Sequence, residues 1–223
     1  MEYINCLRQS GSAYETRDGN PFSFLKKELE AERLLSSTPD ATLKDYVYNL
    51  NVLSNLYATV GNKDSSLYYT QKAVELFELE GQTNNTLYAS ELSTLCGALT
   101  NNHSYTKAIE IGKKSIEILS KISLKKNEII LLRQAVSNLS HAHFEAGEIH
   151  KAIEILQPQV SEDYPDDREK LTETQRLVTY CQRAGLRNLE KEYCDKSLKL
   201  AEKIGGKKSN LYANALCYIS GVQ

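Results

Sequence analysis

The sequence of 223 residues predicts an all-α protein, a right-handed α-solenoid of stacked antiparallel helix pairs. Three observations predict this fold. Apolar residues recur at spacings of three and four, as they do along one face of a helix. Breaks rich in Gly and Asn interrupt that pattern about every twenty residues, the length of one helix and its turn. The same order of large and small residues then returns in successive segments of the chain.

The clearest unit covers residues 40–80. Leu50, Leu53 and Tyr57 form one apolar face of a first helix, which Gly61-Asn62 then breaks. The apolar stripe of the second helix consists of Leu67, Ala73, Val74 and Phe77. Ser54 and Ser66 are small at the points where the two helices must approach closely. This block therefore predicts one antiparallel helix pair.

The last large residue before each turn recurs along the chain. It is Tyr14, Tyr57, Leu99, His143 and Cys181, with spacings of 43, 42, 44 and 38 residues. A coiled coil would continue its heptads through the Gly-Asn breaks, and a plain helix bundle has no reason to repeat this order of residues. The recurrence therefore favours about five repeat units.

In order, we expect eleven helices. The predicted pairs and the unpaired last helix are 3–17 with 21–36, 40–60 with 63–80, 84–101 with 104–122, 126–146 with 148–159, 166–184 with 187–204, and 208–221. Pro158 and Pro165 bracket the acidic segment between the fourth and fifth pairs, which is either a hinge or an ordinary long turn.

This pattern resembles the tetratricopeptide repeat (TPR). The residues that carry the resemblance are Leu50, Leu53-Ser54, Tyr57, Gly61-Asn62, Ser66 and Ala73. The family repeat is about 34 residues long, so the longer period here is similar to the kinesin-light-chain subclass. The resemblance implies a single TPR-like superhelical domain over 1–223, whose first helices line a concave groove. Because the last helix, LYANALCYISGV, is apolar, we expect the chain to be a fragment of a longer protein or to self-associate through this helix.

Composition and charge argue against several classes of protein. The formal charge is −2 and the pI is about 6.1, so the basic excess of a nucleic-acid-binding protein is missing. No apolar run approaches the roughly 18 residues that a membrane span needs. The five cysteines are odd in number and form no CxxC motif. We interpret them as buried free thiols, which indicates a reducing compartment and a cytoplasmic location.

The sequence contains no motif of an enzyme or a cofactor site. Phosphate-binding glycine loops and the nucleophile elbow are absent. His141 and His143 are two residues apart and point to different faces of a helix, so we predict no metal site. Cys181 and Cys194 face each other in one predicted hairpin, where packing is a simpler explanation than redox chemistry. We therefore predict a protein without catalytic activity, cofactor or metal.

The remaining candidates for function are polar residues beside the apolar stripe of the first helices. We predict that these residues bind a partner protein or peptide: Asn51, Asn55, Thr94, Gln134, Asn138, His141, Arg176, Thr179 and Arg183. Amide side chains can bracket an extended peptide, and the two arginines can hold a carboxylate. The family's carboxylate clamp needs a lysine that does not accompany Asn51 and Asn55.

Two functions follow from these observations. The first is a protein–protein interaction scaffold that binds a peptide or helix in its concave groove. The alternative is a regulatory or sensor repeat region of a larger signalling protein that has a protease, kinase or transcription-factor effector elsewhere in its chain.

Overall fold

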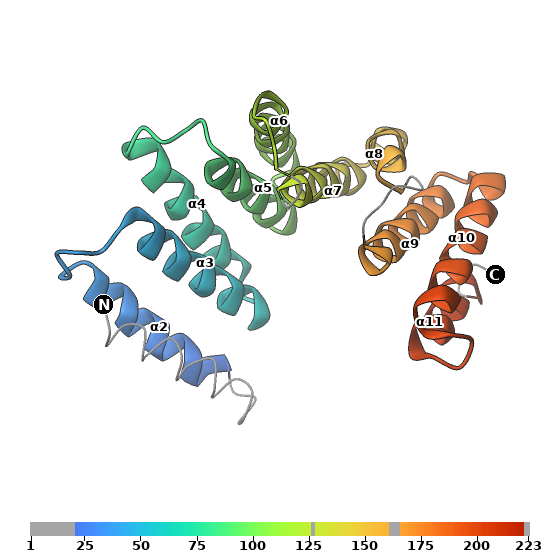
Figure 1. Ribbon diagram of the computed structural model, residues 1–223, viewed down its shortest axis with the longest axis horizontal. Helices are drawn as coiled ribbons and strands as arrows, with labels where there is room; N and C mark the ends of the chain where they lie inside the picture. The colour runs from blue at the N-terminus through green and yellow to red at the C-terminus, as the bar shows by residue number, and fades with distance from the viewer. Residues whose placement is uncertain (1–20, 126–127, 161–165, 221–223) are drawn as a thin grey trace. The chain divides into compact units, whose positions relative to one another are not determined.

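The computed structural model describes residues 21–125, 128–160 and 166–220, and the side chains of these segments between 24 and 216. All regular structure in these segments is helical, which confirms the predicted all-α fold (Figure 1). The first predicted helix, 3–17, lies outside the described residues. The contacts divide the chain into two compact units, residues 1–131 and 132–223. The single domain over 1–223 stays a prediction.

The first unit contains five described helices, each packed against the next in the chain. They are α2 (Pro21–Leu35), α3 (Leu43–Thr59), α4 (Lys63–Leu79), α5 (Thr86–Asn101) and α6 (Tyr105–Lys121). In the predicted repeats, α3 and α5 are first helices, whereas α2, α4 and α6 are second helices.

The second unit contains α7 (Ile129–Glu145), which begins at the boundary between the units, followed by α8 (Ile149–Leu156) and the 3-10 turn η1 (Gln157–Val160). It continues with α9 (Asp167–Arg183), α10 (Arg187–Gly205) and α11 (Asn210–Ser220). Here α7, α9 and α11 are first helices. Leu216 of α11 is exposed while Ala215 is buried, and self-association through this helix stays a prediction.

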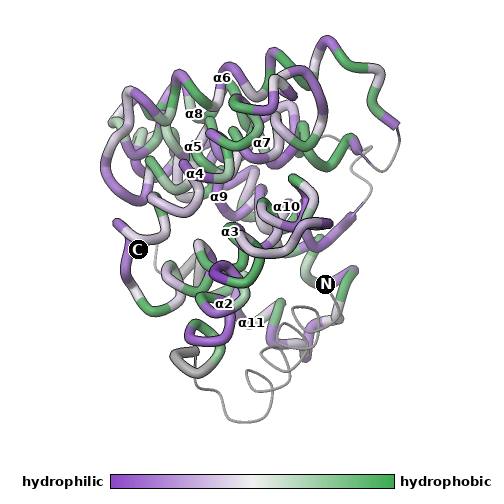
Figure 2. Tube along the Cα trace, turned by 90° about the vertical axis from the view of Figure 1, so that its left-hand side faces the viewer, coloured by the Kyte–Doolittle hydropathy of each residue, from purple (hydrophilic) through white to green (hydrophobic). Residues whose placement is uncertain are grey.

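Local sequence sets where these helices begin. Thr42 and Asp45 form a capping box at the start of α3, and Asn62, Asn85 and Asp166 cap α4, α5 and α9 with their side-chain oxygens. Hydrophobic and hydrophilic residues alternate at short intervals along the helices (Figure 2). Each helix therefore has an apolar side to bury against its neighbours.

Small residues make the close contacts between paired helices that the sequence predicts. Ser54 Oγ donates to the carbonyl of Ser66 at 3.0 Å, and Ser140 Oγ donates to the carbonyl of Ala152 at 2.8 Å. These two bonds join equivalent positions of the α3–α4 and α7–α8 pairs. The repeated bond confirms the register of these two pairs.

The turns inside the helix pairs need a left-handed backbone. Gly61, Gly147 and Gly185 have φ angles of 80°, 81° and 70°, but the equivalent residue of the α5–α6 pair is His103, with φ of 61°. A non-glycine residue in this conformation costs about 1–2 kcal/mol. The His103 ring offsets part of that cost, because its Nδ1 lies 2.8 Å from the hydroxyl of Tyr105.

We therefore expect His103→Gly to raise the free energy of unfolding by about 0.5–1 kcal/mol. Chemical denaturation followed by circular dichroism measures it. The matched control is Gly147→Ala, for which an added Cβ meets no atom within 4 Å, so that only the backbone effect should lower stability. A less stable His103→Gly protein would mean that the contact with Tyr105 outweighs the backbone strain.

Candidate functional site

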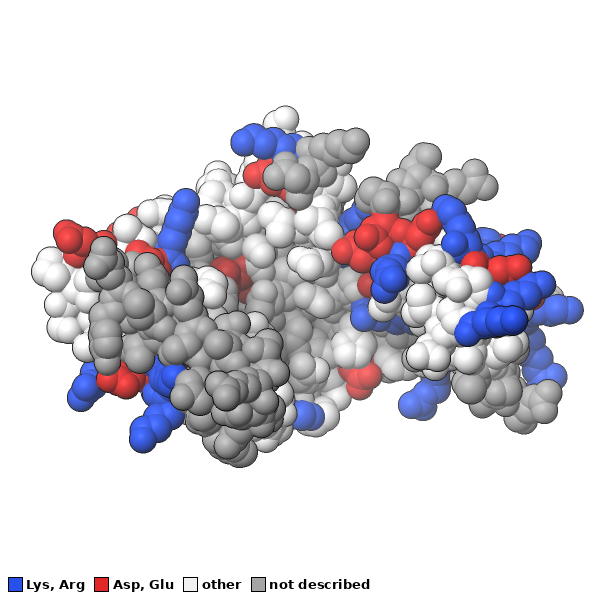
Figure 3. Space-filling view, turned by 60° about the horizontal axis from the view of Figure 1, so that its bottom comes forward, with Lys and Arg blue, Asp and Glu red and all other residues white. Residues whose placement is uncertain are grey.

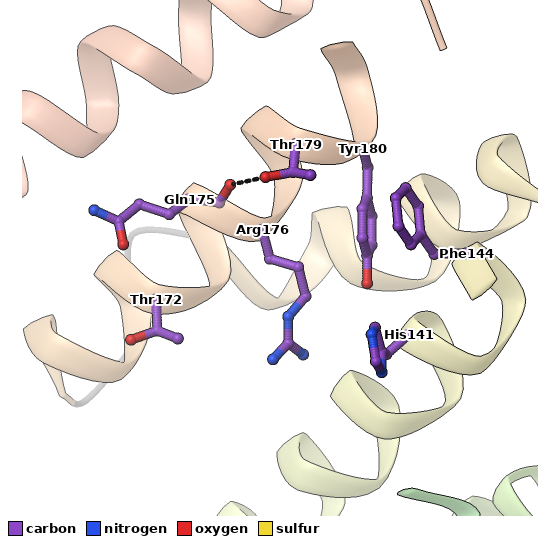
Figure 4. A pocket seen from close by; sticks show the side chains of 7 residues that line it. All are labelled: His141, Phe144, Thr172, Gln175, Arg176, Thr179 and Tyr180. Atoms are coloured by element: carbon purple, nitrogen blue, oxygen red, sulfur yellow. Dashed lines mark hydrogen bonds between the residues drawn. The ribbon is translucent and has the colours of Figure 1, made fainter. Parts of the chain in front are cut away.

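Three of the nine residues predicted to bind a partner line one hollow of the second unit, here called the α7–α9 hollow. They are His141 of α7 and Arg176 and Thr179 of α9 (Figure 4). The other lining residues are Phe144, Thr172, Gln175 and Tyr180. The hollow has a volume of about 260 Å³. Pockets for small molecules usually measure about 300–1,000 Å³, so this one suits a side chain or a short stretch of peptide.

An aromatic pair forms one wall of the α7–α9 hollow. The rings of Phe144 and Tyr180 are stacked, with centroids 4.3 Å apart and planes 17° from parallel. Burial raises the pKa of Tyr180 to about 12, so the phenol stays neutral. Its hydroxyl makes no hydrogen bond to another described residue, and in Figure 4 it points toward His141. The wall therefore combines an apolar surface with one donor that is not yet used.

Arg176 is held in place by two neighbours. Its Nη1 donates to Ser137 Oγ and lies 3.4 Å from Glu173 Oε2. Ser137 in turn donates to Glu173 Oε1 at 2.9 Å, which closes a three-residue network between α7 and α9. The side chain of Glu173 is 13% exposed and that of Arg176 is 31% exposed. The guanidinium is therefore oriented, and its charge is partly neutralised.

This network corrects one expectation. From the sequence, Arg176 was expected to be an exposed charge whose removal would leave stability unchanged. In the structure its loss would leave the half-buried carboxylate of Glu173 without a cation, and such a loss lowers stability. The sequence does not reveal this pairing directly, because Ser137 and Glu173 are 36 residues apart.

His141 stands at the other side of the α7–α9 hollow. Its Nε2 lies 3.4 Å from Glu145 Oε1, and the end of the Arg176 side chain points toward its ring (Figure 4). Burial and, next to it, the charge of Arg176 lower the pKa of His141 below its ordinary value, although Glu145 opposes the shift. The imidazole is therefore neutral at pH 7 and can act as one donor or one acceptor.

The remaining predicted residues do not join this hollow. Gln134 and Arg183 are exposed at other places in the second unit, and Arg183 does not share the hollow with Arg176. Asn138 is half-buried on α7. In the first unit Asn55 is exposed on α3, whereas Thr94 is exposed on α5 and donates to the carbonyl of Ser90 at 3.2 Å. Asn51 Nδ2 donates to Glu91 Oε1 at 2.9 Å.

A recurrent pair of residues escaped the sequence analysis. Glu91 and Glu173 both stand eight residues before the large residue that precedes the turn, at Leu99 and Cys181. Each accepts a hydrogen bond from the preceding first helix of its unit, Glu91 from Asn51 and Glu173 from Ser137. Aligning the units on their large residues would have shown these carboxylates at one repeat position.

The described residues show a thiol chemistry of packing. Cys96, Cys181 and Cys194 are buried and free. Burial raises the pKa of Cys96 to about 12 and that of Cys181 to about 11, so both remain protonated. Such thiols are poor nucleophiles. Cys6 and Cys217 lie outside the described side chains.

Two searches of the described part of the chain gave no site. It holds no group of three His, Cys, Asp or Glu residues that could bind a metal ion, and none of its helices has the length and apolarity to cross a membrane. On the face in Figure 3, basic and acidic side chains of the described residues are interspersed. That mixture is consistent with the formal charge of −2.

The sequence matches no protein-family model and no curated protein, but solved structures are similar to it. A putative kinesin light chain from Podosopora anserina, with nearly identical TPR-like repeats, has a TM-score of 0.71 at 14% identity, over 93% of this chain and 98% of that chain. BtubC from P. vanneervenii has a TM-score of 0.75 at 12% identity, over 93% and 84%. A Rap protein complexed with competence and sporulation factor has 0.70 at 15%, over 97% of this chain and 63% of the Rap chain.

These likenesses confirm the predicted fold, an α-solenoid of TPR-like units, and the resemblance to kinesin-light-chain repeats. At such identities they show the fold alone. The side chains of the α7–α9 hollow therefore carry any argument about function.

Proposed function

We propose that this chain is a protein-interaction scaffold without catalytic activity, which binds a peptide or helix of a partner on its first helices. The observation that carries the proposal is the α7–α9 hollow, where Arg176, His141 and the Tyr180 hydroxyl converge beside an aromatic wall. A scaffold of the same fold, the Rap protein, holds competence and sporulation factor. The buried free thiols support a reducing, cytoplasmic location.

The chemistry of the hollow favours a particular peptide end or side chain. The guanidinium of Arg176 and the Tyr180 hydroxyl are donors, and a carboxylate is the acceptor that such donors prefer. Phe144 and Tyr180 offer a flat apolar surface to a neighbouring side chain of the same peptide. We infer that the ligand is an acidic or C-terminal segment with an apolar residue next to its carboxylate. No nucleic acid is required.

Arg176→Ala should therefore weaken capture of the partner by about 1.5 kcal/mol, roughly tenfold. This is the low end of the range for charged hydrogen bonds, because Glu173 already neutralises part of the charge. The measurement is a quantitative pull-down from a lysate of the source organism, followed by titration of the recovered partner. A second variant, Thr172→Glu, puts a negative charge on the exposed rim and should also weaken capture of an acidic segment.

The control is Lys196→Ala with Lys199→Ala on α10, a second helix. Lys196 pairs with Glu192 at 2.6 Å, and neither lysine lines the hollow. This double variant should recover partners as the parent does. If the parent, Arg176→Ala and Thr172→Glu proteins recover the same partners equally, the α7–α9 hollow is not the binding site.

A second candidate function is a regulatory repeat region of a larger signalling protein with a protease, kinase or transcription-factor effector. One comparison favours it: the match over 97% of this chain corresponds to 63% of the Rap chain. Reading the gene on both sides of the segment that encodes residues 1–223 tests it. An effector domain in the same reading frame would support this candidate, and stop codons and unrelated genes directly on both sides would contradict it.

A further inference from the structure

A second hollow lies in the first unit, between α2, α3 and α4, and is here called the α2–α4 hollow. It has a volume of about 370 Å³ and opens on a face of α3 other than that of the predicted partner-binding residues. Leu50 lines it, and Asn51, the next residue, points about 100° away around the helix. Its volume falls within the usual range of ligand pockets.

Three leucines from three helices give the α2–α4 hollow an apolar lining. They are Leu29 of α2, Leu50 of α3 and Leu76 of α4. Leu50 is 2% exposed and belongs to the core, whereas Leu29 is 36% exposed at the rim. An apolar group that enters the hollow would therefore cover leucine surface that water now contacts.

One polar atom inside the α2–α4 hollow lacks a partner. Asn49 lines the hollow and is 1% exposed. Its Nδ2 donates to Glu28, at 2.8 Å to Oε2 and 3.2 Å to the backbone carbonyl, and Glu28 does not line the hollow. Its Oδ1 has no hydrogen-bond partner among the described residues. Because the nitrogen is turned to Glu28, Asn49 has an acceptor left for a ligand, and a buried acceptor without a donor is unfavourable.

The rim of the α2–α4 hollow carries cations. Lys72 pairs with Glu32 at 2.7 Å, so the carboxylate of this pair is already engaged. Lys72 Nζ also lies 5.9 Å from the centroid of the Tyr68 ring. Arg33 is exposed beside the pair. Cations in this position favour the face of an aromatic ring over an aliphatic side chain.

We propose that the α2–α4 hollow binds a tryptophan or tyrosine side chain of a partner protein, with the N–H or O–H of the ring donating to Asn49 Oδ1. These two side chains combine a large apolar ring with one donor, which is what the leucines, the cations and the free amide oxygen together require. The site is on the second-helix side of the first unit. It therefore does not depend on the function proposed for the α7–α9 hollow.

The test uses three probes of known chemistry: N-acetyl-tryptophan amide, its 1-methyl-indole analogue, which lacks the ring N–H, and N-acetyl-leucine amide. Titrations are followed by the backbone NMR signals of residues 49, 50 and 76. We expect the tryptophan probe to shift these signals at millimolar concentration. The methylated analogue should bind about fivefold more weakly, the factor of one ordinary hydrogen bond, and the leucine probe more weakly still.

Two variants locate the binding. Leu29→Glu puts a charge at the rim without touching Asn49 or its bonds to Glu28, and it should abolish the shifts. Leu79→Glu is the matched control, because Leu79 is 81% exposed on α4 and does not line the hollow. The proposal is overturned if the tryptophan probe shifts none of the three signals, if both indole probes bind equally, or if Leu29→Glu binds as the parent does.

Discussion

The double substitution Ala73→Leu with Ala108→Leu should lower the free energy of unfolding by about 2–6 kcal/mol. Both alanines are fully buried, Ala73 in α4 and Ala108 in α6. Each added side chain has to displace packed neighbours, at a cost of about 1–3 kcal/mol. The two sites lie on separate helices with no close contact between them, so the costs should add. Urea denaturation of the two single variants and the double variant measures these losses.

The control is Ala58→Leu, at an exposed position of α3, which should change stability by less than about 0.5 kcal/mol. The pairing of α5 with α6 is what makes Ala108 a tight contact. If Ala108→Leu unfolds at the same urea concentration as the parent, the helices of this pair do not approach each other at that position.

Local signals in the sequence were sufficient to predict most helix boundaries. The predicted 63–80 became Lys63–Leu79 because Asn62 caps the first turn, a short-range interaction. The prediction was less accurate where a proline interferes. The helix predicted over 148–159 ends as an α-helix at Leu156 and continues as the 3-10 turn Gln157–Val160. Pro158 has no amide hydrogen to continue the α-helical bonds.

The candidate site was predictable in part. Apolar periodicity marks the buried stripe, and the residues beside it lie on the first helices as expected, which is how His141, Arg176 and Thr179 were found. The partners of these residues were missed. A glutamate on a helix surface gives no signal that it is buried, and Glu173 is buried only because Ser137 of another helix donates to it. Such pairings depend on how two helices pack.

Glu91 provides the second large effect, because it is a buried acid without a cation beside it. It is 7% exposed, and Asn51 Nδ2 donates to its Oε1 at 2.9 Å. Its Oε2 and the Oδ1 of Asn51 are buried acceptors with no hydrogen-bond partner among the described residues. In the second unit the equivalent Glu173 lies 3.4 Å from Arg176. The equivalent of that arginine on α5 is Thr94.

The sign of the pH dependence follows from this environment. Burial raises the pKa of Glu91 above its ordinary value of 4.5, although the hydrogen bond from Asn51 opposes the shift. The contribution of the neutral acid to stability is therefore fully present below pH 4.5, the ordinary value. It is lost as the pH rises through the raised pKa of the folded protein. At pH 7 the parent bears the cost of a buried carboxylate.

Glu91→Gln removes that cost. Its amide oxygen can still accept from Asn51, and its amide nitrogen adds a donor in a place where Asn51 Oδ1 lacks one. We expect the variant to be more stable than the parent by about 1–3 kcal/mol at pH 7, the cost of a buried polar group left without its partner. Near pH 4 the difference should disappear. Urea denaturation of both proteins across this pH range measures the difference at each pH.

A second variant, Thr94→Arg, tests the cause. It supplies α5 with the arginine that α9 has, so it should stabilise the ionised form of Glu91 and raise stability at pH 7 more than at pH 4. Arg176 aligns its guanidinium with Glu173 from three residues away on the same helix, and residue 94 is likewise three residues from Glu91. Equal stability of the parent, Glu91→Gln and Thr94→Arg proteins at pH 7 would show that water reaches the Glu91 carboxylate and that its burial has no energetic cost.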